Sequence, residues 1–156
     1  PLYARPTVCE QLIREYEYIF KTNPYPGAPR VVLNPIENEP FNINEDIFTP
    51  IEGIHYKLPV YGYRINNFSY ITDMNHISDN ELKKMEGSDV IVINALQKEH
   101  HMSHFTLSEA LKLINQLQPK KAFLTHMSHR MGLHAEIETE LPENVHLAYD
   151  GLTIEC

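Results

Sequence analysis

The chain has 156 residues, of which 42% are hydrophobic and 22% are charged, so it is long and apolar enough to bury a core. This composition excludes a largely disordered chain, and no run approaches the roughly 20 apolar residues that span a bilayer. The formal net charge of -8 argues against a general nucleic-acid surface, which needs clustered Lys and Arg, but is compatible with a small anionic substrate held by metal ions.

The first predicted element is a surface helix that is capped by Thr7 and ends at the Pro- and Gly-containing segment 23–27. Short β-rich runs follow, separated by turn residues. Asn66-Asn67 divides two of these runs, as in a tight hairpin. The strands expected in this half of the chain cover residues 31–33, 41–43, 47–49, 61–65 and 68–72.

The second half of the chain changes to a pattern of alternating strands and helices. Ser78 with Glu81 and Thr106 with Glu109 have the spacing of a capping box, which predicts two helix starts. Apolar runs predict strands buried on both faces and joined by a right-handed parallel crossover. We therefore expect an α/β fold with a mixed sheet. The remaining elements are strands at 90–93 and 122–124, a helix at 134–140 and a final hairpin of 145–148 with 152–154.

Cysteine and histidine usage narrows the kinds of site to expect. Cys9 and Cys156 lie near opposite ends without a Cys-x-x-Cys pattern, so neither a disulfide framework nor a thiolate zinc site is indicated. A reduced, cytoplasmic setting is the expectation that follows. The nine histidines are unusual, because histidine is a common metal ligand and titrates near neutral pH.

Several of these histidines, and one aspartate, stand where predicted strands end. In open α/β folds, side chains from different elements meet beyond the carboxyl ends of strands. Asp73 follows 70–72, His126 follows 123–125, and His55 follows the run at 47–54. Imidazoles and a carboxylate placed in this way suit zinc, manganese or iron, and a bridging Asp offsets the repulsion between two cations. The loop after 89–95 carries His100, His101 and His104.

Each of these residues also has an ordinary alternative. His55 is otherwise a solvated loop histidine, and Asp73 a turn carboxylate that accepts backbone N–H bonds. His104 is either an exposed loop histidine or, because it precedes a capped helix whose N-terminus favours anions, a proton donor beside a bound phosphate. We expect His129 to be a supporting or surface residue rather than a ligand. Three further histidines are expected to be structural or exposed: His76, His134 and His146.

Residues 55 to 130 resemble the metallo-β-lactamase superfamily, and most closely its branch of the phosphonate-pathway cyclic phosphodiesterase and ribonuclease Z. Four motifs stand in the family's order, which is more specific than any one of them alone. They are Ile54-His55-Tyr56-Lys57-Leu58-Pro59 for a ligand motif, Tyr70-Ile71-Thr72-Asp73 for the strand before the bridging aspartate, Ser103-His104-Phe105-Thr106 for the catalytic histidine, and Leu124-Thr125-His126-Met127-Ser128-His129 for the final ligand motif.

The resemblance implies a four-layer αββα sandwich with two divalent metal ions, which are zinc or manganese, with iron as a further option. It implies that His55 binds one metal, that His126 binds the other, and that Asp73 bridges both. It also implies a catalytic role for His104 at the scissile phosphate. In the intact protein, a metal-bound hydroxide would then hydrolyse a small or cyclic phosphodiester.

The sequence departs from the family in one respect, because the His-x-His-x-Asp-His motif occurs nowhere between Pro1 and Cys156. We therefore expect residues 1–156 to be the C-terminal part of a single domain, incomplete at its N-terminus and inactive alone. One alternative is a tRNA-processing nuclease of the ribonuclease Z type, with nucleic acid as the less favoured partner. Another is a non-catalytic interaction domain. A homodimer through an exposed sheet edge is also expected.

Overall fold

The computed structural model describes residues 1–23 and 25–155, so Cys156 and residue 24 of the predicted helix-stopping segment lie outside the described residues. The chain forms two compact units, residues 1–41 and 42–156. No helix in the described ranges is long and apolar enough to cross a membrane. The membership of the whole chain in one domain stays a prediction.

The first unit combines a short parallel strand pair with two helices. β1 (Leu2–Ala4) pairs with β2 (Leu33–Pro35), and α1 (Pro6–Glu15) and α2 (Glu17–Phe20) lie between them in sequence. The helix is confirmed, but the prediction that Thr7 caps it is wrong. α1 instead begins with Pro6 after the cap residue Arg5, because the fixed φ of proline suits a first helical turn, where no N–H partner is needed.

The second unit is built on one mixed sheet. Its described strands follow the order β10-β9-β8-β6-β5-β4-β3, and β7 pairs with β4. The hairpin predicted at Asn66-Asn67 is confirmed, and Asn66 adopts a φ of 52°, which asparagine tolerates well. The strands are β3 (Phe41–Ile43), β4 (Asp46–His55), β5 (Leu58–Ile65), β6 (Phe68–Ile71), β7 (His76–Ile77), β8 (Val90–Asn94), β9 (Lys121–Thr125) and β10 (Val145–Leu147).

One half of this sheet is parallel, as predicted. β6, β8, β9 and β10 run in the same direction, with α3 (Asp79–Lys83), α4 (Leu107–Leu117) and α5 (His134–Glu140) in the connections. Both predicted helix starts are confirmed: the Ser78 side chain accepts from the Glu81 N–H, and Thr106 with Glu109 forms a reciprocal capping box. The α/β class and the mixed sheet are therefore confirmed.

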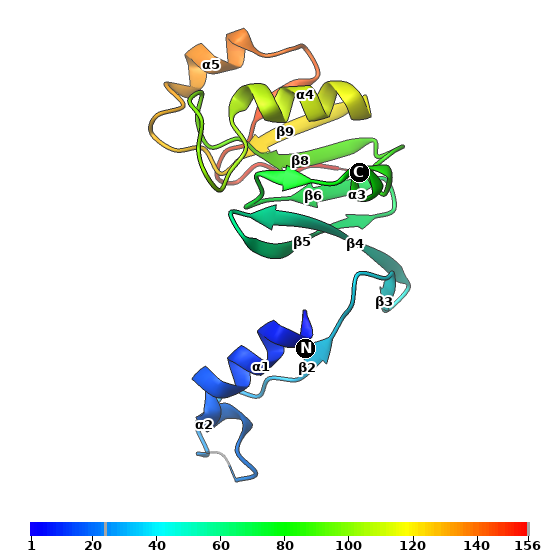
Figure 1. Ribbon diagram of the computed structural model, residues 1–156, viewed down its shortest axis with the longest axis vertical. Coiled ribbons are helices and arrows are strands. Elements are labelled where there is room, and N and C mark those ends of the chain that lie inside the picture. The colour runs from blue at the N-terminus through cyan, green and yellow to red at the C-terminus, as the bar shows by residue number, and fades with distance from the viewer. Residues whose placement is uncertain (24, 156) are drawn as a thin grey trace. The chain divides into compact units, whose positions relative to one another are not determined.

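The buried strands β8 and β9 carry apolar side chains on both faces of the sheet. Ile91, Ile93 and Leu124 belong to the main core, together with Leu107, Ala110 and Ile114 of α4. Figure 1 shows α4 lying along β8 and β9. The intervening residues Val90, Val92 and Phe123 form a smaller cluster. Because successive strand residues point to opposite faces, this smaller cluster marks the face away from α4.

The final predicted hairpin is wrong. β10 pairs in parallel with β9, and none of the described residues after β10 forms a strand. A turn instead carries the chain back over the smaller cluster, where Leu152 and Ile154 pack. Covering this apolar face removes more apolar surface from water than extending the short edge strand β10 would.

Candidate metal centre

The four residues predicted for the site come from four separate segments of the second unit. His55 is the last residue of β4, Asp73 lies two residues beyond β6, and His126 directly follows β9. His104 lies in the loop between β8 and α4. Because β6, β8 and β9 are parallel neighbours, their carboxyl ends meet at one edge of the sheet, and the structure brings all four side chains together there.

Asp73 and His104 form the centre of this cluster. His104 Nε2 lies 3.4 Å from Asp73 Oδ1, and His126 Nε2 lies 3.5 Å from the same oxygen. The His104 ring stacks on His126 with 4.7 Å between ring centroids and meets His55 edge-on at 4.8 Å. The donor atoms of His55, Asp73 and His104 all lie within 4.8 Å of one another.

His104 is buried, with 9% of its surface exposed, so its alternative as an exposed loop histidine is wrong. Its Nδ1 lies 2.8 Å from the Ser103 hydroxyl and 3.2 Å from Nδ1 of His101. If the Ser103 hydroxyl donates to Nδ1, the proton of a neutral imidazole stands on Nε2, which faces Asp73. That tautomer would place an N–H donor inside the cluster.

The pKa values of the two central groups are coupled to their surroundings. Burial lowers the pKa of His104 below its ordinary value, and the neighbouring His126 and His55 act in the same direction, whereas Asp73 opposes them. Burial alone would raise the pKa of Asp73, but His126, the Thr72 hydroxyl and His104 together hold it below its ordinary value. These two shifts favour an ionised Asp73 carboxylate and a neutral His104 imidazole, which are the protonation states that metal ligation requires.

Two of the site residues have an unusual backbone. Asp73 has a φ of 56° and His126 a φ of 62°, both in the left-handed region that residues with a Cβ seldom adopt. Each turns the chain sharply just past its strand. Such conformations persist where surrounding contacts enforce them, and they concentrate at functional sites.

Asn94, at the end of β8, supplies one of these contacts and was not predicted as a site residue. Its fully buried side chain accepts from Met74 N at 3.1 Å and donates to Met74 O at 2.9 Å. Phe105 N donates to the same carbonyl at 2.8 Å, which joins the loop of His104 to that of Asp73. An asparagine inside an apolar strand, at 90–94, was the signal in the sequence for this role.

Gly53 provides the space that this arrangement needs. A Cβ built at Gly53 would overlap Sδ of Met74 and lie 3.1 Å from the backbone oxygen of His76. Met74 is completely buried directly after Asp73. The glycine two residues before His55 therefore lets the Asp73 loop pack close to β4.

Apart from His101, which contacts His104, the other histidines lie outside the cluster described above. His76, His129 and His134 are exposed, in agreement with their prediction as structural or surface residues. His146 Nδ1 lies 2.9 Å from Glu138 Oε1, whose other carboxylate oxygen accepts from Leu147 N at 2.8 Å. This pair joins α5 to β10 and is a structural contact.

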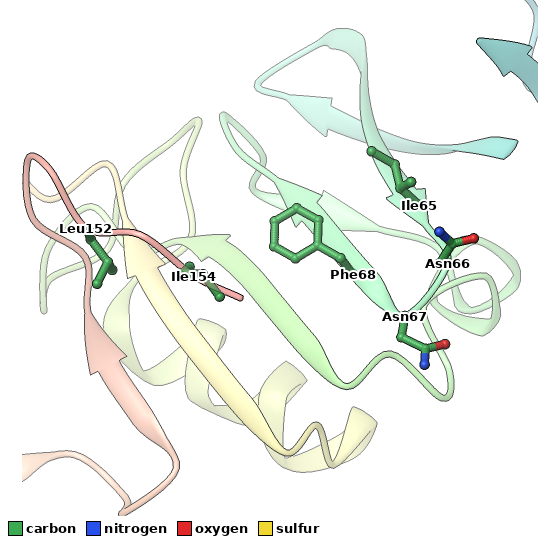
Figure 2. A pocket seen from close by; sticks show the side chains of 6 residues that line it. All are labelled: Ile65, Asn66, Asn67, Phe68, Leu152 and Ile154. Atoms are coloured by element: carbon green, nitrogen blue, oxygen red, sulfur yellow. The ribbon is translucent and has the colours of Figure 1, made fainter. Parts of the chain in front are cut away.

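An open groove of about 480 Å³ lies on the face of the smaller apolar cluster. Figure 2 shows the side chains that line it, including Phe68, Leu152 and Ile154. The other lining residues are Ile65, Asn66 and Asn67. None of these side chains is ionisable, so the groove lacks the groups that acid-base or metal chemistry would need.

The donor set of the cluster fits divalent metal ions. Imidazole nitrogen and carboxylate oxygen are ligands that zinc and manganese accept, and the donor atoms of His55, Asp73 and His104 converge within 4.8 Å. Both His104 and His126 approach Oδ1 of Asp73, so this carboxylate stands between imidazoles from two different loops. A carboxylate in that position can bind a cation together with either imidazole.

Comparison with known proteins identifies the family and the fold. A diphosphatase from the PhnP family has a crystal structure that is 30% identical and aligns with a TM-score of 0.89, covering 100% of this chain and 58% of that one. The metallo-β-lactamase fold protein YhfI from Bacillus subtilis is 19% identical with a TM-score of 0.72, covering 97% of this chain and 63% of that one, and it supports the fold alone.

A protein of Porphyromonas gingivalis named octanoyltransferase is 33% identical over 153 residues, which cover 97% of this chain and 31% of that protein. The chain thus spans under two thirds of the relatives it matches. Residues 1–127 match the family described as the β-lactamase superfamily domain. The chain therefore belongs to the β-lactamase superfamily, and its fold is the metallo-β-lactamase fold.

Proposed function

We propose that this protein hydrolyses small or cyclic phosphodiesters at a centre of two divalent metal ions. The observation that carries the proposal is the convergence of His55, Asp73, His104 and His126 at one edge of the sheet. The likeness to a diphosphatase of the PhnP family supports phosphorus, rather than carbon, as the site of attack. Zinc or manganese is proposed as the metal.

In this proposal, His55, His126 and Asp73 would hold the cations. Bound cations would supply Lewis-acid stabilisation of phosphoryl charge and would lower the pKa of water. The lowered pKa of Asp73 keeps its carboxylate ionised and available as a ligand at neutral pH. The left-handed backbone at Asp73 and His126 accompanies a close approach of the two side chains, with His126 Nε2 3.5 Å from Asp73 Oδ1.

His104 is proposed to orient or protonate the leaving oxygen of the substrate. Burial shields its ring from bulk water, and the Asp73 carboxylate 3.4 Å from Nε2 favours a proton on that nitrogen, which faces the cluster. The lowered pKa of His104 makes its imidazolium a readier proton donor once an anionic substrate has favoured protonation. Positioned acid-base groups of this type contribute about 10²- to 10⁴-fold to a rate.

The test compares His104→Ala with His100→Ala, which removes an exposed histidine from the same loop. Full-length protein would be assayed with bis-p-nitrophenyl phosphate and a cyclic nucleotide, and its metal content measured in parallel. We expect His104→Ala to keep its metal and lose about 100-fold or more in kcat, with His100→Ala unchanged. Retained activity would remove the catalytic role of His104. Loss of metal would make His104 a ligand instead.

Two further substrates separate the proposal from its alternatives. Cleavage of a precursor tRNA in preference to small diesters would favour a nuclease. Transfer of an octanoyl group, the activity in the name of the Porphyromonas gingivalis relative, would place the chemistry at carbon. We expect neither reaction to exceed diester hydrolysis.

A further inference from the structure

Asn75 lies two residues beyond Asp73 and makes hydrogen bonds to two other segments of the site. Its backbone N–H donates to Ile54 O at 2.8 Å, and its side-chain Oδ1 accepts from Tyr56 N at 3.0 Å. These two bonds flank His55 on either side along the chain. The third bond runs from Asn75 Nδ2 to Met102 O at 3.2 Å, in the loop that carries His104.

The bond to Tyr56 has a particular structural consequence. Tyr56 has a φ of 59°, in the left-handed region, and it begins the tight turn that joins β4 to β5 directly after His55. A non-glycine residue keeps this conformation only where other contacts favour it. The acceptor that Asn75 offers to Tyr56 N is such a contact, so the direction of the chain just past His55 depends on this side chain.

We propose that Asn75 is a positioning residue that fixes His55 relative to Asp73 and to the loop of His104. The inference rests on the metal centre proposed above, because Asn75 would keep the metal-ligand residues in their relative positions before the metal binds. Asn75 acts through the backbone next to His55 and Met102, and it is not itself proposed as a ligand. One amide thereby links three of the four segments that form the site.

The side-chain hydrogen bonds of Asn75 are partly open to solvent. A positioning role and a purely structural role therefore predict different effects of removing the side chain. Solvent-exposed hydrogen bonds contribute little net stability, because water replaces the lost partner. Misalignment of metal ligands has a larger effect, since mutation of the residues that hold metal ligands in place typically lowers metal affinity by about 10- to 100-fold. A positioning residue should therefore affect metal affinity more than folding.

The experiment compares Asn75→Ala with Asn144→Ala in the full-length protein. Asn144 is a suitable control, because it is likewise half-buried and donates from Nδ2 to a backbone oxygen, that of Pro119 at 3.1 Å, outside the site. Zn²⁺ affinity would be measured by competition with a chromophoric chelator, and thermal unfolding by circular dichroism. We expect Asn75→Ala to weaken Zn²⁺ binding about tenfold, with an unfolding midpoint no lower than that of Asn144→Ala.

NMR of the metal-free protein provides a second measurement that does not depend on metal binding. We expect Asn75→Ala to shift the ring signals of His55 and to speed amide exchange at Tyr56, both of which Asn144→Ala leaves unchanged. Asn75→Asp retains the acceptor for Tyr56 N and removes only the donor to Met102, so its Tyr56 amide should remain protected. This variant also tests the inference if Asn75→Ala does not fold.

The outcomes separate this inference from the proposed function. Wild-type Zn²⁺ affinity in Asn75→Ala, with unshifted His55 signals, would overturn the positioning role while the metal centre stands. A wild-type protein that binds neither Zn²⁺ nor Mn²⁺ would overturn the proposed function instead. The NMR measurements would then still decide whether Asn75 fixes the backbone around His55.

Discussion

Replacement of Asn94 by alanine should destabilise the protein through the loop of Asp73. The substitution removes two hydrogen bonds, from Met74 N to Oδ1 at 3.1 Å and from Nδ2 to Met74 O at 2.9 Å, in a place with no solvent exposure. Met74 O keeps its bond from Phe105 N, but Met74 N loses the partner that the side chain supplied.

The expected magnitude follows from these contacts. Each of the two lost hydrogen bonds contributes about 1 kcal/mol, and a buried N–H left unpaired adds about 1–2 kcal/mol, so Asn94→Ala should cost roughly 3–4 kcal/mol. Urea unfolding followed by circular dichroism would measure the free energy of unfolding. Asn115→Ala, at an exposed position of α4, is the control and should stay within about 0.5 kcal/mol of wild type. A change below about 1 kcal/mol for Asn94→Ala would refute the reasoning.

Three further substitutions test other parts of the structure. Thr106→Ala removes the reciprocal capping box of α4 and should cost about 1 kcal/mol in urea unfolding, whereas the exposed Thr153→Ala should cost almost nothing. Gly53→Ala should lower the unfolding midpoint and weaken Zn²⁺ binding together, because its Cβ would displace Met74 beside Asp73; wild-type behaviour in both would contradict the close packing. Burial alone would raise the pKa of Glu138, but the Leu147 N–H and His146 hold it below its ordinary value. The ionised Glu138 therefore stabilises the folded protein above the unfolded-state pKa, and this stabilisation is lost as pH falls through the folded-state pKa. Glu138→Gln should therefore be less stable than wild type at pH 7, and the difference in free energy of unfolding between the two should become smaller in acid. A difference that does not change with pH would exclude this linkage.

The sequence allowed the four clustered residues to be predicted because three of them stand at or just past the end of a strand with a readable pattern, and the fourth, His104, precedes a capped helix. His126 follows an apolar run that is buried as expected, and Thr106 with Glu109 placed the start of α4 just after His104. Parallel strands bring their carboxyl ends to one edge of a sheet, so local patterns were enough to bring distant residues together.

Other features depend on contacts that local patterns do not contain. An asparagine near a turn is ordinary, so the links from Asn75 to Tyr56 and Met102, 19 and 27 residues away, could not be read from the sequence. The same holds for the path of Leu152 and Ile154. Their alternation is typical of a strand, but the apolar face of Val90, Val92 and Phe123 offers them more burial than an edge pairing would.

The expected homodimer and the upstream ligand motif stay predictions. Light scattering of the purified protein would measure its mass in solution, and a mass of one chain at micromolar concentration would contradict the dimer. The upstream motif would be tested by replacing its histidines in the full-length protein, where we expect loss of metal.

The most direct test of the metal centre is elemental analysis of metal per chain in full-length wild type and Asp73→Ala, paired with hydrolysis of bis-p-nitrophenyl phosphate. We predict about two metal ions per chain and turnover in the wild type, as in two-metal hydrolytic sites. Asp73→Ala should lose metal and turnover together. A wild-type protein free of metal and without turnover, or an Asp73→Ala variant with unchanged metal content, would contradict the account.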